Sequence, residues 1–142
     1  EAPWSPRTVS GGPESVLKAA YVDSSCVVAI ALGEPGASAI ARRIGAFDTL
    51  VAANLVEAEV RSALARERVR PDRNPVAGLR WILPDRPLSA EISIVTAEGY
   101  VRGADLWHLA CALYVAASPD ELTFLTLDER QRAVAMALGF KT

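Results

Sequence analysis

The stretch AAYVDSSCVVAIAL, residues 19–32, decides the fold class of this chain. Its first four residues are apolar and predict a short buried strand, which the polar residues Asp23, Ser24 and Ser25 end. The apolar residues 26–32 then predict a buried helix, stopped by the Gly and Pro residues that follow. A strand that leads through a polar turn directly into a helix is the unit from which parallel α/β sheets are built.

The same alternation continues along the chain. Apolar segments predict further strands over residues 49–53 and 122–127, and helices over residues 37–47, 54–69, 104–117 and 129–138. Asn54 is a good N-cap for the second of these helices. The β-branched segment ISIVT, residues 92–96, favours a strand by propensity, whereas the spacing of its apolar residues gives a helix comparable support.

This alternation predicts an α/β fold with three layers, α/β/α, and a central, mainly parallel sheet. The 142 residues are enough for one such domain, and a 51% share of hydrophobic residues can fill its core. The predicted domain spans residues 16–142. Residues 1–15 contain three prolines and a Gly-Gly pair, so we expect them to be an extension without a core of its own, either a tag or a native segment.

Charge and cysteine content restrict the function classes. Seventeen acidic and fifteen basic residues give a formal net charge of −2, which excludes a protein that coats nucleic acid through bulk positive charge but not an enzyme with a local acidic site. The two cysteines, Cys26 and Cys111, lie in apolar segments and predict buried, reduced thiols. No apolar segment reaches the roughly 18 residues of a membrane span, and no signal peptide is recognisable. These features favour a cytoplasmic protein.

Acidic side chains follow the predicted strands at equivalent places. Asp23 comes directly after the first strand, Asp128 follows strand 122–127, and Asp105 opens helix 104–117. Each alone has a simpler interpretation as a helix N-cap. Because ligands of parallel sheets gather beyond the carboxyl ends of the strands, we expect the three carboxylates to converge. Converging carboxylates repel each other unless a cation lies between them, and an all-oxygen ligand set favours Mg²⁺ or Mn²⁺ over Zn²⁺.

Helix 54–69 offers two further acids, Glu57 and Glu59. Two residues that are two apart on a helix point about 200° from each other, so only one of this pair can face inward. Glu59 falls within the apolar arc, about 40° from Leu55. Glu57 falls beyond its edge, four residues before Arg61, with which it can form a surface pair. A carboxylate on the buried side needs a partner, and a metal site would supply one. The sequence therefore predicts Glu59 as the site glutamate.

With these residues assembled, the chain resembles the PIN-domain ribonucleases, and in particular the VapC-type toxins of type II toxin–antitoxin systems. The matching segments are YVDSS (21–25), NLVEAEVRSAL (54–64), RGADLWHLACAL (102–113) and TFLTLDERQ (123–131). The last two are the most specific, because Arg-Gly-Ala-Asp before an apolar helix and Thr-x-Asp after a strand recur in this order in the family. The resemblance extends over nearly all of the chain beyond the extension, and the family fold places a helix over residues 90–98.

The resemblance implies a PIN-like fold and a metal-dependent endoribonuclease that uses Mg²⁺, with Mn²⁺ as a substitute. The four acids of the family correspond here to Asp23, Glu59, Asp105 and Asp128, and Asp23, Asp105 and Asp128 are the expected metal ligands. Ser25 and Thr126 correspond to small polar residues that orient a carboxylate or a water molecule. The metal would activate a water molecule for attack on the phosphodiester and neutralise charge on the leaving oxygen.

The resemblance also implies partners. These are an RNA substrate, a VapB-type antitoxin and a second copy of the chain in a homodimer. Since the tail of such an antitoxin wraps the toxin, residues 1–15, which include Trp4 and Arg7, have a further interpretation as a segment that comes from or imitates such a tail.

Several assignments stay open from the sequence. We expect His108, the single histidine, to be a packing residue of the core, with a general base as the second interpretation. The arginines between residues 61 and 73 predict a solvated face, with an edge that contacts phosphates as the alternative. A PIN-fold binding module without turnover is the main functional alternative. A receiver-type signalling domain fits less well, because its chemistry needs a lysine near the last strands and the chain has lysines only at Lys18 and Lys141.

Overall fold

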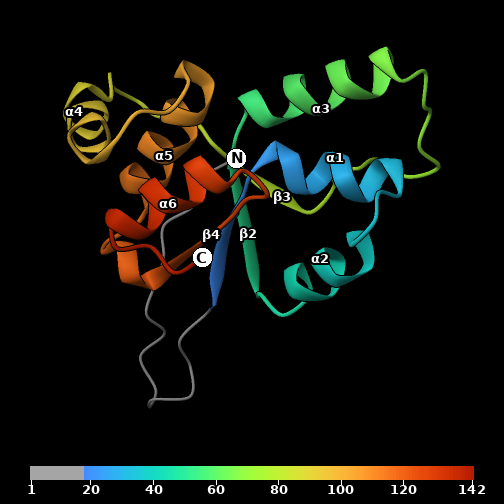
Figure 1. Cartoon of the computed structure of the whole chain (residues 1–142), viewed down its shortest axis with the longest axis horizontal. Coiled ribbons are helices and arrows are strands. Elements are labelled where there is room, and N and C mark those ends of the chain that lie inside the picture. The colour runs from blue at the N-terminus through green and yellow to red at the C-terminus, as the bar shows by residue number, and fades with distance from the viewer. Residues whose placement is uncertain (1–17) are drawn as a thin grey trace.

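The centre of the molecule is a four-stranded, all-parallel sheet (Figure 1). A computed structural model of the chain describes residues 18–142, so the predicted extension over residues 1–15 lies outside the described residues. The strands are β1 (Ala19–Val22), β2 (Thr49–Ala53), β3 (Leu79–Ile82) and β4 (Leu122–Leu125), arranged in the order β3-β2-β1-β4. All four residues of β1 and all four of β4 are buried, as expected for strands of a covered parallel sheet.

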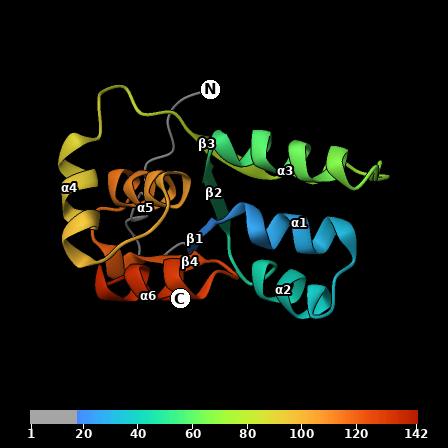
Figure 2. The ribbon, with the colours of Figure 1, turned by 45° about the horizontal axis from the view of Figure 1, so that its top comes forward.

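Helices cover both faces of this sheet (Figures 1 and 2). One layer consists of α1 (Ser24–Leu32), α2 (Ala37–Ile44) and α3 (Leu55–Arg66), and the other of α4 (Ser89–Glu98), α5 (Gly103–Val115) and α6 (Glu129–Ala137), while a 3-10 turn (Pro119–Glu121) precedes β4. The prediction of a three-layer α/β fold with a parallel sheet is therefore confirmed. None of the helices between residues 18 and 142 is long and apolar enough to cross a membrane.

Residues 92–96 lie within the helix α4. The prediction of a strand from their β-branched side chains is therefore wrong. Its buried residues, Glu91 and Val95, are four apart and lie on one helical face. Packing of that face against α5 outweighs the weak intrinsic preference of Ile, Val and Thr for strands.

Three further details differ from the sequence-based expectation. Strand β3 was not predicted, because its four residues include the exposed Arg80 and form no continuous apolar run. Asn54 does occupy the N-cap position of α3, yet its side chain makes no capping hydrogen bond and its backbone is already helical (φ −60°, ψ −18°). The helix also ends at Arg66 instead of reaching residue 69.

The core contains an aromatic stack and both cysteines. The rings of Tyr21 and Phe124, from the paired strands β1 and β4, lie nearly parallel with centroids 4.9 Å apart. Cys26 and Cys111 are buried and unpaired. Burial raises the pKa of the Cys26 thiol to about 11 and that of Cys111 to about 12, so both are protonated thiols at neutral pH. The prediction that both thiols are buried is confirmed.

Candidate functional site

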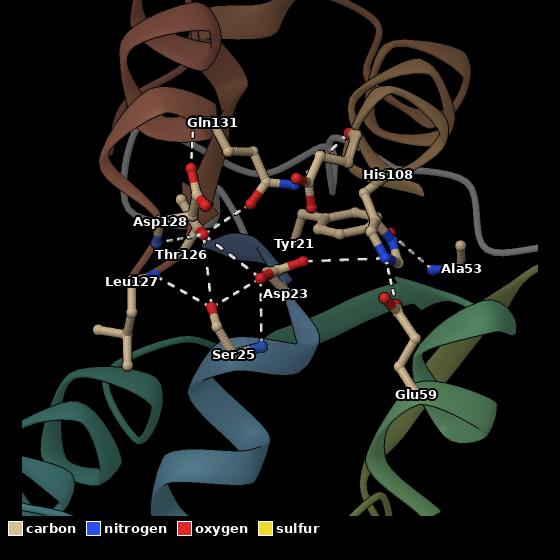
Figure 3. A network of polar contacts seen from close by, with 11 residues as sticks. Tyr21, Asp23, Ser25, Ala53, Glu59, His108, Thr126, Leu127, Asp128 and Gln131 are labelled. Atoms are coloured by element: carbon tan, nitrogen blue, oxygen red, sulfur yellow. Dashed lines mark hydrogen bonds and ion pairs between the residues drawn. The ribbon is translucent and has the colours of Figure 1, made fainter. Parts of the chain in front are cut away.

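The carboxyl ends of β1 and β4 form the candidate site. From β1 the chain proceeds to β2 and β3 on one side, and β4 returns on the other side, so the direction of winding changes between β1 and β4. Ligands of open α/β sheets bind at such a switch point, because the connecting helices leave on opposite faces. Asp23 follows β1 directly, and its backbone amide donates to the carbonyl oxygen of Leu125 at 2.9 Å. Figure 3 shows the polar side chains that meet here.

Asp23 has one carboxylate oxygen that is held and one that has no partner. Its Oδ2 accepts hydrogen bonds from the backbone amide of Ser25 at 3.2 Å and from the Ser25 hydroxyl at 2.6 Å, and it lies 3.3 Å from the Thr126 hydroxyl. The bond from the amide makes Asp23 the N-cap of α1. Its Oδ1 is buried and has no hydrogen-bond partner within residues 18–142. A buried carboxylate oxygen without a partner is costly, so this arrangement fits a cation that completes it.

Ser25 and Thr126 connect Asp23 to the loop before α6. The Ser25 hydroxyl oxygen accepts from the backbone amide of Leu127 at 3.0 Å, and the Thr126 hydroxyl oxygen accepts from that of Asp128 at 3.0 Å. Both hydroxyls therefore lie between the loop backbone and Oδ2 of Asp23, as Figure 3 shows. The orientation of this carboxylate is fixed by groups from two separate strand–helix turns.

Gln131 is a site residue that the sequence reasoning missed. Its side chain is fully buried; Oε1 accepts from the Thr126 hydroxyl at 2.6 Å, and Nε2 lies 3.5 Å from the backbone carbonyl oxygen of Asp105. Its backbone amide donates to Oδ1 of Asp128 at 2.7 Å, which makes Asp128 the N-cap of α6. The available signal was helical spacing: Gln131 shares the buried face of α6 with Val134, three residues later, and a buried amide needs polar partners.

Asp105 lies in the first turn of α5, close to the other acids. Arg102 occupies the N-cap position of this helix, so the capping interpretation does not apply to Asp105. Burial raises the pKa of the Asp105 carboxyl, and the negative charges of Asp23 and Asp128 raise it further. The three carboxylates are thus within electrostatic reach of one another.

The two glutamates of α3 lie in different environments. The Glu59 carboxylate contacts Nε2 of His108 at 2.5 Å, and its side chain is 30% exposed. Glu57 pairs with Arg61 at 3.0 Å on the surface, where both side chains are accessible. The helix therefore turns Glu59 toward the site and leaves Glu57 outside it.

His108 is fully buried on α5 and has polar partners on both ring nitrogens. Its Nδ1 lies 2.5 Å from the Tyr21 hydroxyl, and its Nε2 contacts Glu59 and lies 3.8 Å from Oδ1 of Asp23. The Tyr21 hydroxyl in turn accepts a hydrogen bond from the backbone amide of Ala53 at 3.0 Å. The expectation of a core histidine is correct as to burial, but packing alone does not describe these contacts.

The described side chains of the site supply carboxylate oxygens, but they do not surround a single point at which an ion would be fully coordinated. Across residues 18–142, no group of three or more His, Cys, Asp or Glu side chains is arranged as a ready-made ion site. The donor set nevertheless fits Mg²⁺ or Mn²⁺, because Asp23 presents a buried oxygen without a partner and Asp105 and Asp128 add negative charge nearby. Both ions keep several water ligands, so they do not need a complete protein cage.

The described residues form an open hollow and an apolar pocket that bear on the position of the site. An open one of about 410 Å³ adjoins the site glutamate and is lined by Ala58, Glu59, Ser62, Ala63 and Arg66. An apolar pocket of about 300 Å³ lies beside α1 and α2, and none of the four site acids lines it. The polar contacts of Asp23, Glu59 and Asp128 therefore lie outside the lining of this apolar pocket.

Comparisons with known proteins identify a family. A family model described as PIN domain matches residues 20–136, which include every site residue described above. Searches of curated proteins and of solved structures found no match.

Proposed function

Because this chain belongs to the PIN domain family, whose fold is of the nuclease type, we propose that it is a ribonuclease that hydrolyses RNA phosphodiester bonds with the help of Mg²⁺ or Mn²⁺. The observation that carries the proposal is the buried Oδ1 of Asp23, which lies at the switch point of the sheet and has no hydrogen-bond partner among residues 18–142. A structural N-cap needs only one carboxylate oxygen, and here that oxygen is Oδ2. The second oxygen remains available for a ligand.

Asp23, Asp105 and Asp128 would hold the ion, and Glu59 would complete the acidic site. When bound, the ion supplies an activated water molecule and charge neutralisation at the leaving oxygen. The backbone amide and the hydroxyl of Ser25 hold Oδ2 of Asp23 and so keep Oδ1 turned toward the site, while the Thr126 hydroxyl links Gln131 to the backbone amide of Asp128. The four carboxylates would repel an RNA backbone in the absence of a cation, which makes cleavage dependent on a divalent ion.

The substitution Asp23→Asn tests this function. The amide side chain keeps an oxygen for the capping bonds but loses the anionic ligand, so we expect folded protein and loss of RNA cleavage by about 100-fold or more, since metal ligands dominate such chemistry. The measurement is cleavage of a labelled RNA by purified protein with Mg²⁺, Mn²⁺ or EDTA.

Glu57→Gln is the matched control for this experiment, because it removes one negative charge from the outer face of α3. It should keep most of the activity. If the wild-type protein, freed of any partner, binds RNA and cleaves none with either ion, the chain is a binding module and the nuclease proposal is wrong.

We further propose that the chain is a toxin of the VapC type that acts in the cytoplasm, pairs as a homodimer and is inhibited by a VapB-type antitoxin. The segments at residues 102–113 and 123–131 support this, because they carry the motifs that resemble these toxins. Induced expression in bacteria should arrest growth, expression of Asp23→Asn should not, and sequencing of the new RNA ends should identify the target. Unimpaired growth with active soluble enzyme would argue against the toxin role. Light scattering of the purified protein tests the homodimer.

A further inference from the structure

His108 joins three elements of the fold in one chain of hydrogen bonds. The Ala53 amide at the end of β2 donates to the Tyr21 hydroxyl of β1, this hydroxyl meets Nδ1 of His108, and Nε2 of His108 meets Glu59 of α3 (Figure 3). Both the tyrosine and the histidine side chains are fully buried. Buried imidazole nitrogens need hydrogen-bond partners, and here the partner of Nε2 is a glutamate of the candidate site.

The number of available protons determines which atom donates in each hydrogen bond between Ala53, Tyr21, His108 and Glu59. If the Tyr21 O–H donates to Nδ1, then Nε2 carries the ring proton and donates to Glu59, and the amide of Ala53 also has its acceptor. If Nδ1 carried a proton, it would use the Tyr21 oxygen as acceptor and leave the buried tyrosine proton without a partner. Only the Nε2–H tautomer satisfies every donor in this chain of bonds.

This tautomer has a consequence for the acidic site. The Nε2–H bond fixes the end of a flexible glutamate side chain beside Asp23, whose Oδ1 lies 3.8 Å from the same nitrogen. Both ring nitrogens are occupied, so the imidazole has no free lone pair with which to accept a proton from water, and the general-base interpretation does not apply.

We propose that His108 is a positioning residue of the nuclease site, which orients Glu59 through Nε2–H, and that Tyr21 sets the tautomer that makes this possible. The proposal rests on the proposed nuclease function as far as activity is concerned. The hydrogen-bond chain itself can be tested without any activity.

The chain contains one histidine, so a nitrogen-15 correlation spectrum of the imidazole reports on His108 alone. In the metal-free wild-type protein at neutral pH we expect the Nε2–H tautomer. Tyr21→Phe keeps the ring stack on Phe124 but removes the hydroxyl, and should move the signals toward a mixture of tautomers. Tyr114→Phe is the matched control, since its hydroxyl bonds Asp85 and not His108, and should leave the signals unchanged. An Nδ1–H tautomer, an imidazolium, or signals unaffected by Tyr21→Phe would overturn the assignment.

Activity and metal binding then test the positioning role. His108→Leu removes the bond to Glu59 and should lower RNA cleavage and Mn²⁺ affinity by about 10- to 100-fold, the usual cost of losing a residue that orients a ligand. His108→Gln retains an N–H donor and should recover most of both. Adding Glu59→Gln to His108→Leu should cause little further loss, because the two residues act through one contact.

The outcomes separate the two proposals. Strictly additive losses, or a His108→Gln variant as impaired as His108→Leu, would show that His108 does not act through Glu59. Absence of cleavage by the wild-type protein with every ion would instead contradict the nuclease function, while the tautomer and the Mn²⁺ titration would still decide whether His108 orients Glu59.

Discussion

Asp23 and Asp105 have environments that favour a bound cation but lower the stability of the folded chain without one. Asp23 caps α1 with one oxygen and leaves the other buried, with no hydrogen-bond partner in the part of the chain that the structure describes. Asp105 lies close to other carboxylates, and burial together with the charges of Asp23 and Asp128 raises its pKa, so that its ionisation costs folding stability. Residues of this kind destabilise the free protein, and they are retained at sites where a ligand later compensates for them.

Asp105→Asn should therefore stabilise the metal-free protein. Because burial, Asp23 and Asp128 raise the pKa of Asp105, ionisation of this group above its ordinary carboxyl pKa lowers the stability of the fold, and a neutral side chain removes that cost. We expect a higher unfolding midpoint in EDTA at neutral pH, and a gain that vanishes at acidic pH, where the wild-type carboxyl is protonated in both states.

The control for this prediction is Glu57→Gln, which removes a charge that is already paired with Arg61. Its midpoint should be unchanged or slightly lower. An Asp105→Asn variant that is less stable than the wild type in EDTA would mean that its charge at the N-terminal turn of α5 is worth more than the repulsion from its neighbours.

At the scale of elements, α4 is attached to α5 by a polar cluster. Arg86, in the loop before α4, forms two bonds to the Glu91 carboxylate, at 2.7 and 3.0 Å, and its guanidinium lies 5.1 Å from the centre of the Tyr114 ring. The Tyr114 hydroxyl donates to Asp85 at 2.9 Å. The bond from Arg86 lowers the pKa of the Glu91 carboxyl. These contacts fix the start of a helix whose sequence also favours a strand.

Arg86→Met should lower the unfolding midpoint at neutral pH, because it leaves Glu91, only 10% exposed at its side chain, without its cationic partner. A lowered carboxyl pKa contributes stability above its ordinary value and loses that contribution as the pH falls through the folded-state value. The difference between variant and wild type should therefore close at strongly acidic pH. Circular dichroism melts over a pH series measure this.

Arg66→Met is the matched control, since Arg66 pairs with Glu67 where both side chains are well exposed. Exposed pairs of this kind contribute little. Equal effects of the two substitutions would show that burial of Glu91 does not matter for the attachment of α4.

Helices and strands could be predicted where the sequence pattern that specifies them lies within the segment itself. Segments such as AAYVDSSCVVAIAL contain an apolar strand, an N-cap and an apolar helix in sequence, and β1, α1 and β4 formed where these signals lie. The edge strand β3 and the helix α4 were not determined in this way. Their type depends on neighbours far along the chain, β2 for the first and α5 for the second.

At the scale of the whole molecule, binding of the proposed ion should raise the unfolding midpoint of the chain. A ligand that binds the folded chain and not the unfolded one raises the unfolding midpoint, and the rise grows with its excess over the dissociation constant. We expect Mn²⁺ to raise the midpoint of the wild-type protein and EDTA to reverse it, as measured by calorimetry. Asp23→Asn should abolish most of the shift.

Cys26 and Cys111 provide a parallel check that the fold stays intact in these variants. Both thiols are buried, so they should react with a thiol reagent only after denaturation. A variant whose thiols react in native buffer has lost its core packing, and its lost activity would then say nothing about the metal. An equal Mn²⁺ shift in wild type and Asp23→Asn, with thiols protected in both, would contradict a metal role for Asp23.

The sequence alone determined the fold class and predicted the acids of the candidate site, because apolar periodicity and residues placed after strands are local features. It also favoured Glu59 over Glu57, since a helix has a fixed angle per residue. Only the tertiary structure decided that one oxygen of Asp23 has no hydrogen-bond partner among the described residues, that Gln131 joins α6 to Thr126, and that His108 lies between Tyr21 and Glu59. These contacts join residues from separate strands and helices, and no local pattern specifies which buried polar groups will meet.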